Sequence, residues 1–185
     1  YAIGAEVNGF DTMVKLSDAP VIVIEGDEYH TSPDEPTPKF MHYHHHIGLI
    51  SGIEWDHINV FPSENDYVSQ FKRFADATPK AGSLIYNEED GRVNTLGSQE
   101  RDDILAFPYG SPEFKVKDGI TILKTKEGDF PLKIFGQHNL LNLMGAKSVL
   151  NRIGVTDSAF YEAVTTFEGA GKRLEKMNAN GSVPV

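Results

Sequence analysis

Two apolar runs in the first third of the chain are each followed at once by polar residues. Residues 21–24 read Val-Ile-Val-Ile and lead into the acidic residues 25–28, and residues 47–53 lead into the sequence Glu-Trp-Asp-His at residues 54–57. Continuous β-branched runs of this length are typical of strands buried on both faces of a parallel sheet. Because ligands of open α/β sheets bind at the carboxyl ends of the strands, both runs predict polar groups at one functional edge.

The pattern then alternates between helical and strand-like stretches. Ser63 precedes a segment with helical spacing and is a suitable N-cap residue. The apolar residues that share one face of this helix are Tyr67, Val68, Phe71, Phe74 and Ala75. Residues 83–86 and 104–107 predict further strands, with a polar, acidic stretch up to Asp103 between them. This alternation predicts an α/β fold with a mostly parallel sheet flanked by helices.

A different pattern occupies residues 114–135. Short strand-like runs are separated there by Lys117-Asp118-Gly119 and by the sequence Lys-Glu-Gly-Asp at residues 126–129. Both are turn signals of the kind that connects antiparallel strands. The stretch therefore predicts a small antiparallel β-meander.

Helical spacing returns after the meander. It covers residues 139–153 and ends at Gly154, which is a suitable residue just past a helix end. Thr156 or Asp157 is then expected to cap a last helix that runs through Thr166. The glycine-rich residues 167–173 predict a loop that leads out of the domain.

The composition excludes several classes of protein. The 185 residues carry 17 Lys and Arg against 27 Asp and Glu, a formal net charge of −10, and no cysteine. No run reaches the roughly 18 consecutive apolar residues of a membrane span, and the negative charge disfavours nucleic acid as a partner. Without thiolates, a metal must be held by oxygen or imidazole ligands, so hard cations are the expected guests. Since the chain starts without Met, we expect a middle piece of a longer protein.

The polar groups after the two apolar runs are the first candidates for chemistry. Glu25, Asp27 and Glu28 could hold a magnesium ion through their carboxylates, or could form a solvated acidic turn. Asp56-His57 could bring an imidazole to the same edge, although a single histidine near a strand end is more often a hydrogen-bonded structural group.

A histidine run at residues 42–46 suggests a transition metal. His42, His44, His45 and His46 belong to it. Alternation along an extended chain would send His44 and His46 to one face and His45 to the other, whereas zinc needs convergent ligands. A zinc hydrolase that uses the run together with Asp27 or Glu28 is the function this cluster would imply.

Two further segments could contact a nucleotide. Asn139 and Asn142 lie three residues apart at a helix start, where their amides could read an adenine or Asn139 could cap the helix. Lys172-Arg173 could contact a phosphate or could be solvated surface. No G-x-x-x-x-G-K-[ST] phosphate-binding loop occurs in the chain.

Four motifs occur in the order in which one known family carries them. That family shows E-x-D-E after a strand, D-H after a second strand, G-x-H-N-x-x-N at a helix start and F-x-G-x-x-[KR]-R-x-E at the domain exit. Here the motifs stand at residues 25–28, 56–57, 136–142 and 167–175. On these motifs the chain resembles the central, ATP-binding domain of the Mur ligase family, the ADP-forming amide ligases that build the peptidoglycan stem peptide.

The resemblance implies roles for the candidate residues at the phosphates. Glu25 is implied to bind the Mg²⁺ that bridges the ATP phosphates, and His57 is implied to serve a second Mg²⁺ near an acyl phosphate. Arg173 is implied to approach the phosphates from the hinge. One departure is Gly52, which stands where relatives often carry an Asn five residues before the D-H histidine.

For the adenine, the resemblance implies that Asn139 and Asn142 face the base with His138 beside them. Residues 1–175 are then the central domain without its phosphate loop, and residues 176–185 begin the linker to a carboxy-terminal domain. The implied reaction phosphorylates the carboxylate of UDP-N-acetylmuramate, and the amine of an amino acid or peptide attacks the acyl phosphate. Such an enzyme is expected in the cytoplasm, and this piece alone is expected to be inactive.

Two acceptors fit the sequence of this chain. The tracts E-G-D-E-Y-H-T-S, K-F-M-H-Y and I-E-W-D-H-I-N-V-F-P resemble family members that accept L-alanyl-γ-D-glutamyl-meso-diaminopimelate. Members that accept L-alanine share much of this pattern and remain the alternative. A non-catalytic nucleotide-binding module is the other rival to the ligase.

Overall fold

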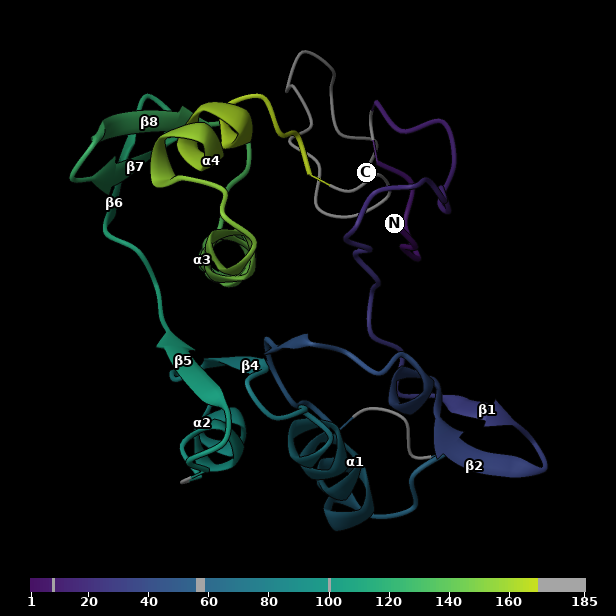
Figure 1. Cartoon of the computed structure of the whole chain (residues 1–185). Helices are drawn as coiled ribbons and strands as arrows, with labels where there is room; N and C mark the ends of the chain where they lie inside the picture. The colour runs from purple at the N-terminus through teal and green to yellow at the C-terminus, as the bar shows by residue number, and fades with distance from the viewer. Residues whose placement is uncertain (8, 56–58, 100, 170–185) are drawn as a thin grey trace, which may run out of the picture.

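A computed structural model describes residues 1–7, 9–55, 59–99 and 101–169 of the chain (Figure 1). Its elements follow one another as β1 (His30–Ser32), β2 (Glu35–Pro38), the 3-10 helix η1 (Lys39–His42), β3 (Ile47–Ile50), α1 (Glu64–Asp76), β4 (Ser83–Asn87), α2 (Gly91–Gly97), β5 (Leu105–Tyr109), β6 (Phe114–Lys117), β7 (Ile120–Thr125), β8 (Gly128–Leu132), α3 (Gln137–Arg152) and α4 (Asp157–Val164). This mixture confirms the predicted α/β class. In the described part of the chain, no helix is both long enough and apolar enough to span a membrane.

The strands β3, β4 and β5 form a parallel sheet in that order. Leu49 of β3 lies opposite Ile85 of β4, which lies opposite Phe107 of β5. Every residue of β4 is buried, because helices cover both faces of the sheet. Figure 1 shows α1 and α2 on one side of the sheet and α3 on the other. The strands predicted at residues 83–86 and 104–107 are confirmed.

The core under α1 and α2 explains why α1 was predictable and α2 was not. Tyr67 and Ala75 of α1 are buried with Tyr86 of β4, as the apolar spacing of α1 requires. Helix α2 is short, is bounded by glycines and buries only Val93 and Leu96 besides Gly97, so its sequence carries little helical signal. The β1–β2 hairpin, whose strands are three and four residues long, was also not predicted.

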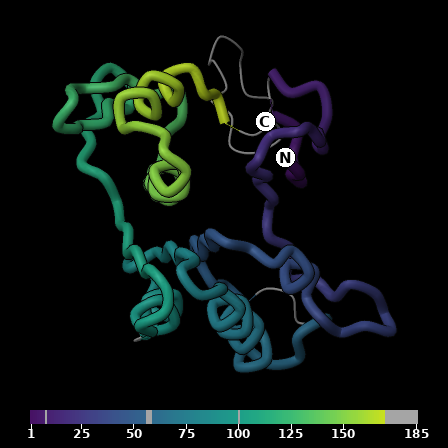
Figure 2. The backbone as a smooth tube through the Cα atoms, in the orientation of Figure 1, coloured from purple at the N-terminus to yellow at the C-terminus, as the bar shows by residue number. Residues whose placement is uncertain are grey.

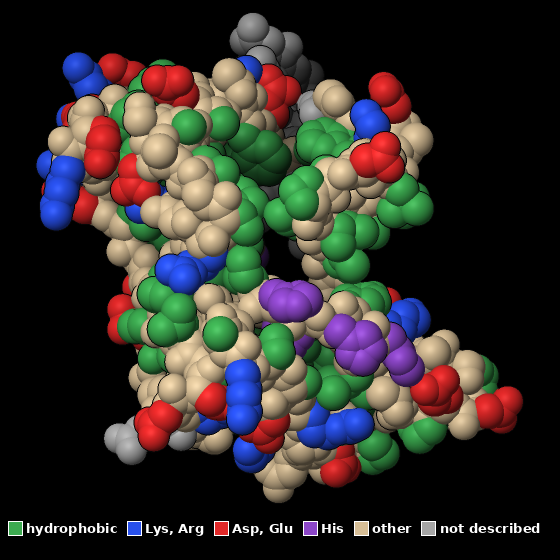
Figure 3. Space-filling view, in the orientation of Figure 1, with side chains coloured by type: hydrophobic (Ala, Val, Ile, Leu, Met, Phe, Trp, Pro, Cys, Tyr) green, Lys and Arg blue, Asp and Glu red, His purple; other side chains and the backbone are tan. Residues whose placement is uncertain are grey.

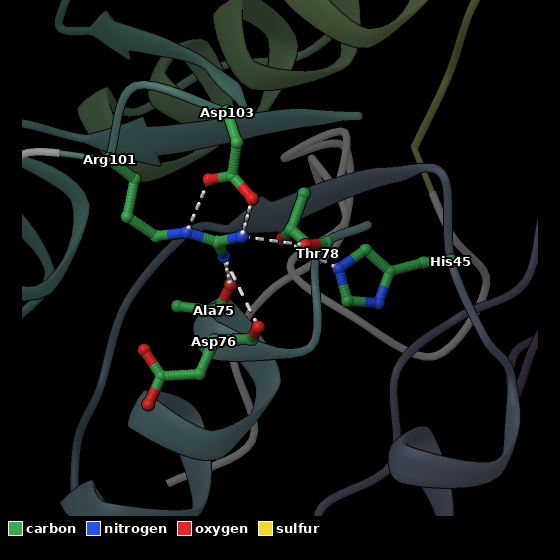
Figure 4. Close-up of polar contacts among 6 residues, drawn as sticks. All are labelled: His45, Ala75, Asp76, Thr78, Arg101 and Asp103. Atoms are coloured by element: carbon green, nitrogen blue, oxygen red, sulfur yellow. Dashed lines mark hydrogen bonds and ion pairs between the residues drawn. The ribbon is translucent and has the colours of Figure 1, made fainter. Parts of the chain in front are cut away.

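Both ends of α1 have their backbone groups satisfied by side chains. At the start, the Ser63 hydroxyl accepts a hydrogen bond from the Asp66 N–H at 3.1 Å, which confirms the predicted N-cap. At the end, the Arg101 guanidinium donates to the carbonyls of Ala75, Asp76 and Thr78 at 3.1–3.3 Å (Figure 4). Since the last carbonyls of a helix lack partners within it, Arg101 closes α1 from a distant part of the chain.

A second core lies between the antiparallel sheet and the last two helices. The strands β6, β7 and β8 pair as the predicted meander. Its buried residues are Leu123, Leu132, Ile134, Leu140, Leu143, Phe160, Tyr161 and Val164. Gly154 follows α3 with φ +89°, and the Thr156 hydroxyl caps α4 by accepting from the Ala159 N–H, so both predicted boundaries are confirmed.

The apolar run at residues 21–24 is not the buried strand that its sequence predicts. Its side chains are between 36% and 53% exposed. Its backbone pairs with Ala2, whose N–H donates to Val23 and whose carbonyl accepts from the Glu25 N–H, at 2.9 Å each. Figure 2 shows this amino-terminal segment standing apart from the β3-β4-β5 sheet.

The position of β3 gives the physical reason. β3 is the edge strand of the parallel sheet, and among the described residues no strand lies along its open side. An apolar run becomes a buried strand only where a neighbour satisfies its backbone hydrogen bonds and covers its faces. Among the described residues, the backbone partner of residues 21–24 is the extended amino-terminal chain at Ala2.

Candidate functional site

A line of hydrogen bonds crosses the carboxyl ends of all three parallel strands. Asn87, at the end of β4, donates from Nδ2 to the Ser51 carbonyl just past β3, at 3.0 Å. Its Oδ1 accepts from the Glu89 N–H, also at 3.0 Å. The Glu89 carboxylate then takes the backbone N–H of Ser111 at 2.5 Å and its hydroxyl at 2.8 Å, just past β5. We call Ser51, Asn87, Glu89 and Ser111 the edge belt.

The start of α3 joins this belt. Gln137 Nε2 donates to the Ser111 hydroxyl at 3.4 Å. Gly136 is the N-cap residue with φ +86° and provides no side-chain cap, so the Asn139 cap considered from the sequence is wrong. The first two turns of α3 carry the candidate adenine residues, and the start of this helix is thereby connected to the carboxyl edge of the sheet.

Three candidate residues lie together on this first part of α3. Asn139 Nδ2 donates to the Phe135 carbonyl at 2.8 Å. Asn142 Nδ2 contacts His138 Nε2 at 3.1 Å, and because an amide nitrogen only donates, His138 accepts there. His138 and Asn142 are exposed, and Asn139 is half-buried. The two amides and the imidazole together offer donors and acceptors of the kind that an adenine edge needs.

A neighbouring group fixes the segment that follows β3. Asp90 is the N-cap of α2, and its Oδ1 accepts from the N–H groups of Arg92 and Val93 at 2.9 and 3.0 Å. Its Oδ2 accepts from the Ile53 N–H at 3.1 Å, and Arg92 donates to the Ile53 carbonyl at 3.3 Å. The backbone at Ile53 is thus held on both sides, just before Asp56 and His57.

The acidic residues 25–28 do not gather at this edge. Glu25 accepts from the Gly4 N–H at 2.6 Å in the amino-terminal segment. Asp27 forms an ion pair with Lys39 at 2.8 Å, and Glu28 accepts from the Tyr67 hydroxyl at 3.2 Å. His57 and Arg173 lie outside the described residues, as does Asp56. The structure therefore leaves the predicted phosphate and metal roles as predictions.

The histidine run is divided among different environments. Figure 3 shows histidine side chains on one face of the molecule. His44 and His46 are exposed, while His45 is half-buried and stacks on Phe74 with the ring centroids 4.0 Å apart. The His45 ring also contacts the Thr78 hydroxyl at 3.0 Å (Figure 4). Burial lowers the pKa of His45 to about 4, so this ring is neutral near pH 7.

Metal binding by the run is not supported. His42 contacts the Thr31 hydroxyl at 2.9 Å and Glu35 at 3.4 Å. Nowhere in residues 1–7, 9–55, 59–99 and 101–169 do three or more His, Asp or Glu side chains converge as metal ligands. The zinc hydrolase interpretation therefore has no site among the described residues, and these residues alone do not assemble a magnesium site either.

The edge belt was missed by reasoning from the sequence. The signal was available, because residues 87–90 read Asn-Glu-Glu-Asp directly after a strand, which is the pattern that drew attention to residues 25–28. That Ser51 and Ser111 are the partners of these residues could not be predicted, because the register between strands decides which strand ends lie side by side.

Comparison with known proteins places these features in one family. Residues 8–150 match the family model described as Mur ligase middle domain. The chain is 30% identical to UDP-N-acetylmuramate–L-alanine ligase of Caldicellulosiruptor bescii, over 95% of this chain and 40% of that protein. It is 25% identical to the enzyme of the same name from Clostridium novyi, over 94% of this chain and 38% of that protein. It thus spans about two fifths of these curated relatives.

Solved structures agree on the fold. The UDP-N-acetylmuramate:L-alanyl-gamma-D-glutamyl-meso-diaminopimelate ligase from Neisseria meningitides superimposes with a TM-score of 0.75 at 20% identity, covering 91% of this chain and 57% of that one. MurF from Acinetobacter baumannii gives a TM-score of 0.60 at 16% identity, over 73% of this chain and 32% of that one. At these identities the likeness concerns the arrangement of the backbone.

Proposed function

Because this chain belongs to the Mur ligase middle-domain family, we propose that it is the ATP-binding domain of a ligase that builds or recycles peptidoglycan precursors. Residues 1–175 form this domain without its phosphate loop, and residues 176–185 begin the linker to a further domain. The full-length protein joins UDP-N-acetylmuramate to an amino acid or peptide in the cytoplasm, using ATP and Mg²⁺. The match over residues 8–150 is the observation that carries this proposal.

The nucleotide is held by the start of α3. His138, Asn139 and Asn142 lie on the first turns of a helix whose start is attached to the carboxyl edge of the parallel sheet. An amide offers a donor and an acceptor, so it suits the alternating groups on an adenine edge. The acceptance at His138 Nε2 fixes which of its ring nitrogens carries the proton, and this orients the Asn142 amide. ATP bound there supplies the phosphoryl group that activates a carboxylate for amide formation.

Glu25, His57 and Arg173 are proposed to act at the phosphates. Glu25 and His57 serve Mg²⁺, and Arg173 neutralises phosphoryl charge, which a planar guanidinium does well. The support is the family motif around each residue. Among the described residues, no three His, Asp or Glu side chains converge on one point as metal ligands.

The peptide L-alanyl-γ-D-glutamyl-meso-diaminopimelate is our first choice of acceptor. The three sequence tracts around residues 25–32, 39–43 and 53–62 support it, and so does the fold likeness to a ligase of that name. L-Alanine is the second choice, and it is favoured by the 30% identity to an L-alanine ligase.

Phosphate release by the full-length protein tests the proposal. ATP, Mg²⁺ and UDP-N-acetylmuramate are supplied, with the peptide and L-alanine as separate acceptors. Release with the peptide alone supports a recycling ligase, and release with L-alanine alone moves the assignment to the biosynthetic reaction. If neither acceptor produces phosphate above the level without acceptor, the proposed function is wrong.

The same assay tests the site. Glu25→Ala is expected to lower turnover at least about a hundredfold, the scale of removing one electrostatic stabiliser. A non-catalytic nucleotide-binding module predicts no change. Elemental analysis of the purified protein addresses the zinc alternative, because a ligase retains no stoichiometric zinc.

A further inference from the structure

Both oxygens of the exposed Glu89 carboxylate accept hydrogen bonds from one residue, Ser111. One oxygen accepts from the Ser111 N–H at 2.5 Å and the other accepts from the Ser111 hydroxyl at 2.8 Å. The N–H of Glu89 itself is held by Asn87, which is only 7% exposed. Both ends of Glu89 are therefore tied, one to the end of β4 and one to the loop after β5.

The loop after β5 passes close to the Glu89 carboxylate at Gly110. A Cβ added to Gly110 would lie 2.9 Å from Glu89 Oε1 and 3.4 Å from Glu88 Oε1. A Cβ almost never lies within 3.0 Å of another heavy atom, so a side chain at Gly110 would displace the carboxylate. Glycine at this position thus fits a loop that must reach Glu89.

The neighbouring Glu88 shows that this is specific to Glu89. Glu88 has the same charge and is also exposed, but in the described part of the chain its carboxylate makes no hydrogen bond or ion pair. Its backbone N–H donates to the Tyr109 carbonyl at 2.9 Å. Glu88 is therefore a matched control for Glu89.

The contacts continue from Ser111 into the nucleotide-binding helix. The Ser111 hydroxyl donates to Glu89 and accepts from Gln137, the first residue of α3. His138 follows directly, and Asn139 and Asn142 lie within the next turn and a half. Since Gly136 provides no side-chain cap, the Gln137–Ser111 contact is a side-chain connection between the start of α3 and the sheet edge.

We propose that Glu89 is a positioning residue of the nucleotide site: through Ser111 and Gln137 it fixes the start of α3, and with it the side chains that face the adenine. This inference rests on the proposed function, because it assigns ATP as the ligand of α3. Glu89 acts on the ligand only through other residues. Both of its carboxylate oxygens already have partners in Ser111.

The test compares Glu89→Gln with Glu88→Gln in the full-length protein. Each change removes one negative charge, but only Glu89→Gln weakens the hydrogen bonds to Ser111. We expect Glu89→Gln to raise the KM for ATP about three- to tenfold, the range of one charge-assisted hydrogen bond, with kcat within about twofold. Glu88→Gln should leave both values unchanged. Equal KM values for the two variants, or a loss confined to kcat, would overturn the proposal.

A second readout does not depend on catalysis. Hydrogen exchange is measured on the same full-length variants, at the Ser111 amide and at the Leu140 amide, which donates to the Gly136 carbonyl in the first turn of α3. Both amides should exchange faster in Glu89→Gln, and the Phe160 amide in α4 should not change. Unchanged exchange at Ser111 and Leu140 would also overturn the proposal.

Ser111→Ala provides an independent variant. It removes the hydroxyl that connects Glu89 with Gln137 but keeps the backbone N–H that Glu89 holds. It should therefore raise the KM for ATP in the same direction as Glu89→Gln. The two proposals fail separately: absence of phosphate release with any acceptor refutes the ligase, whereas exchange that is insensitive to Glu89 refutes the positioning role.

Discussion

The carboxyl edge of the β3-β4-β5 sheet and the amino-terminal residues 1–24 use similar sequence patterns with opposite results. Strand β4 lies between β3 and β5, and all of its residues are buried. The polar residues at its end are hydrogen-bonded to the ends of the neighbouring strands. In residues 21–24 a run even more apolar than β4 is about half exposed, and the Glu25 carboxylate after it accepts a hydrogen bond from the Gly4 N–H of the amino-terminal segment. Whether an apolar run becomes a buried strand therefore depends on the strands that pair with it.

The largest difference in the free energy of unfolding is expected when an isoleucine side chain is truncated in each of the two runs. Ile85 in β4 is fully buried, so Ile85→Ala should cost about 2–5 kcal/mol of the free energy of unfolding. Ile22 is 53% exposed, so Ile22→Ala should stay within about 0.5 kcal/mol. Urea denaturation of the two variants measures both values. Similar costs would mean that residues 21–24 are buried in solution.

A smaller effect is expected where one side chain closes a helix of the sheet's core. Arg101→Met removes the donors to three carbonyls at the end of α1 and should cost about 1–3 kcal/mol. Lys72→Met is the control, because it breaks an exposed i,i+4 ion pair with Asp76 that is worth roughly 0.3–0.5 kcal/mol. Thermal denaturation should rank Arg101→Met clearly below the control, and equal midpoints would contradict the role given to Arg101.

The pH dependence of stability should reveal His45. Its pKa in the folded chain is about 4, below the ordinary value of 6.5, because burial disfavours the charged ring. Between these two values the unfolded chain binds a proton that the folded chain does not, so stability falls as the pH falls from 6.5 toward 4. In His45→Gln this part of the decline should be missing. Urea denaturation at several pH values measures the decline in stability. A decline of the same size in both proteins would refute the role given to His45.

The smallest effect is expected at Gly52, beside the functional edge. Among the described residues, a Cβ there would approach the Asp90 Oδ2 atom, at 3.7 Å, and the backbone does not require glycine. Gly52→Asn should therefore leave the free energy of unfolding within about 0.5 kcal/mol. A loss above about 1 kcal/mol in urea denaturation would show that the segment after β3 is packed more tightly than this.

The fold was predictable where local chemistry decides the structure. Short local sequence patterns determine two of its features. One is Ser63 before an amphipathic helix, and the other is the turn at residues 117–119 between β6 and β7. Helix α2 was not predictable, because it is held by Asp90 at its start and by Gly97 against the Tyr86 ring, where a Cβ would lie 2.1 Å away. Those contacts come from packing against β4 and leave little trace in the local sequence.

The candidate site divides in the same way. His138, Asn139 and Asn142 could be recognised because a helix start with paired amides is a local pattern. In the structure Asn142 contacts His138, whereas Asn139 donates back to the Phe135 carbonyl, and their role toward a nucleotide stays a prediction. The partnership of Asn87 with Ser51, 36 residues apart, depends on strand register. So does that of Glu89 with Ser111, 22 residues apart.

The open edge of β3 has a consequence for how this chain behaves in a concentrated solution. Its sequence, Ile-Gly-Leu-Ile, contains neither the charged residue nor the proline that protects many edge strands from pairing. The half-exposed run at residues 21–24 supplies a second apolar segment rich in β-branched residues. Within the described residues, the chain thus presents an unpaired strand edge and a partly exposed apolar segment, and we expect its tendency to self-associate during concentration to depend on how well this edge is covered.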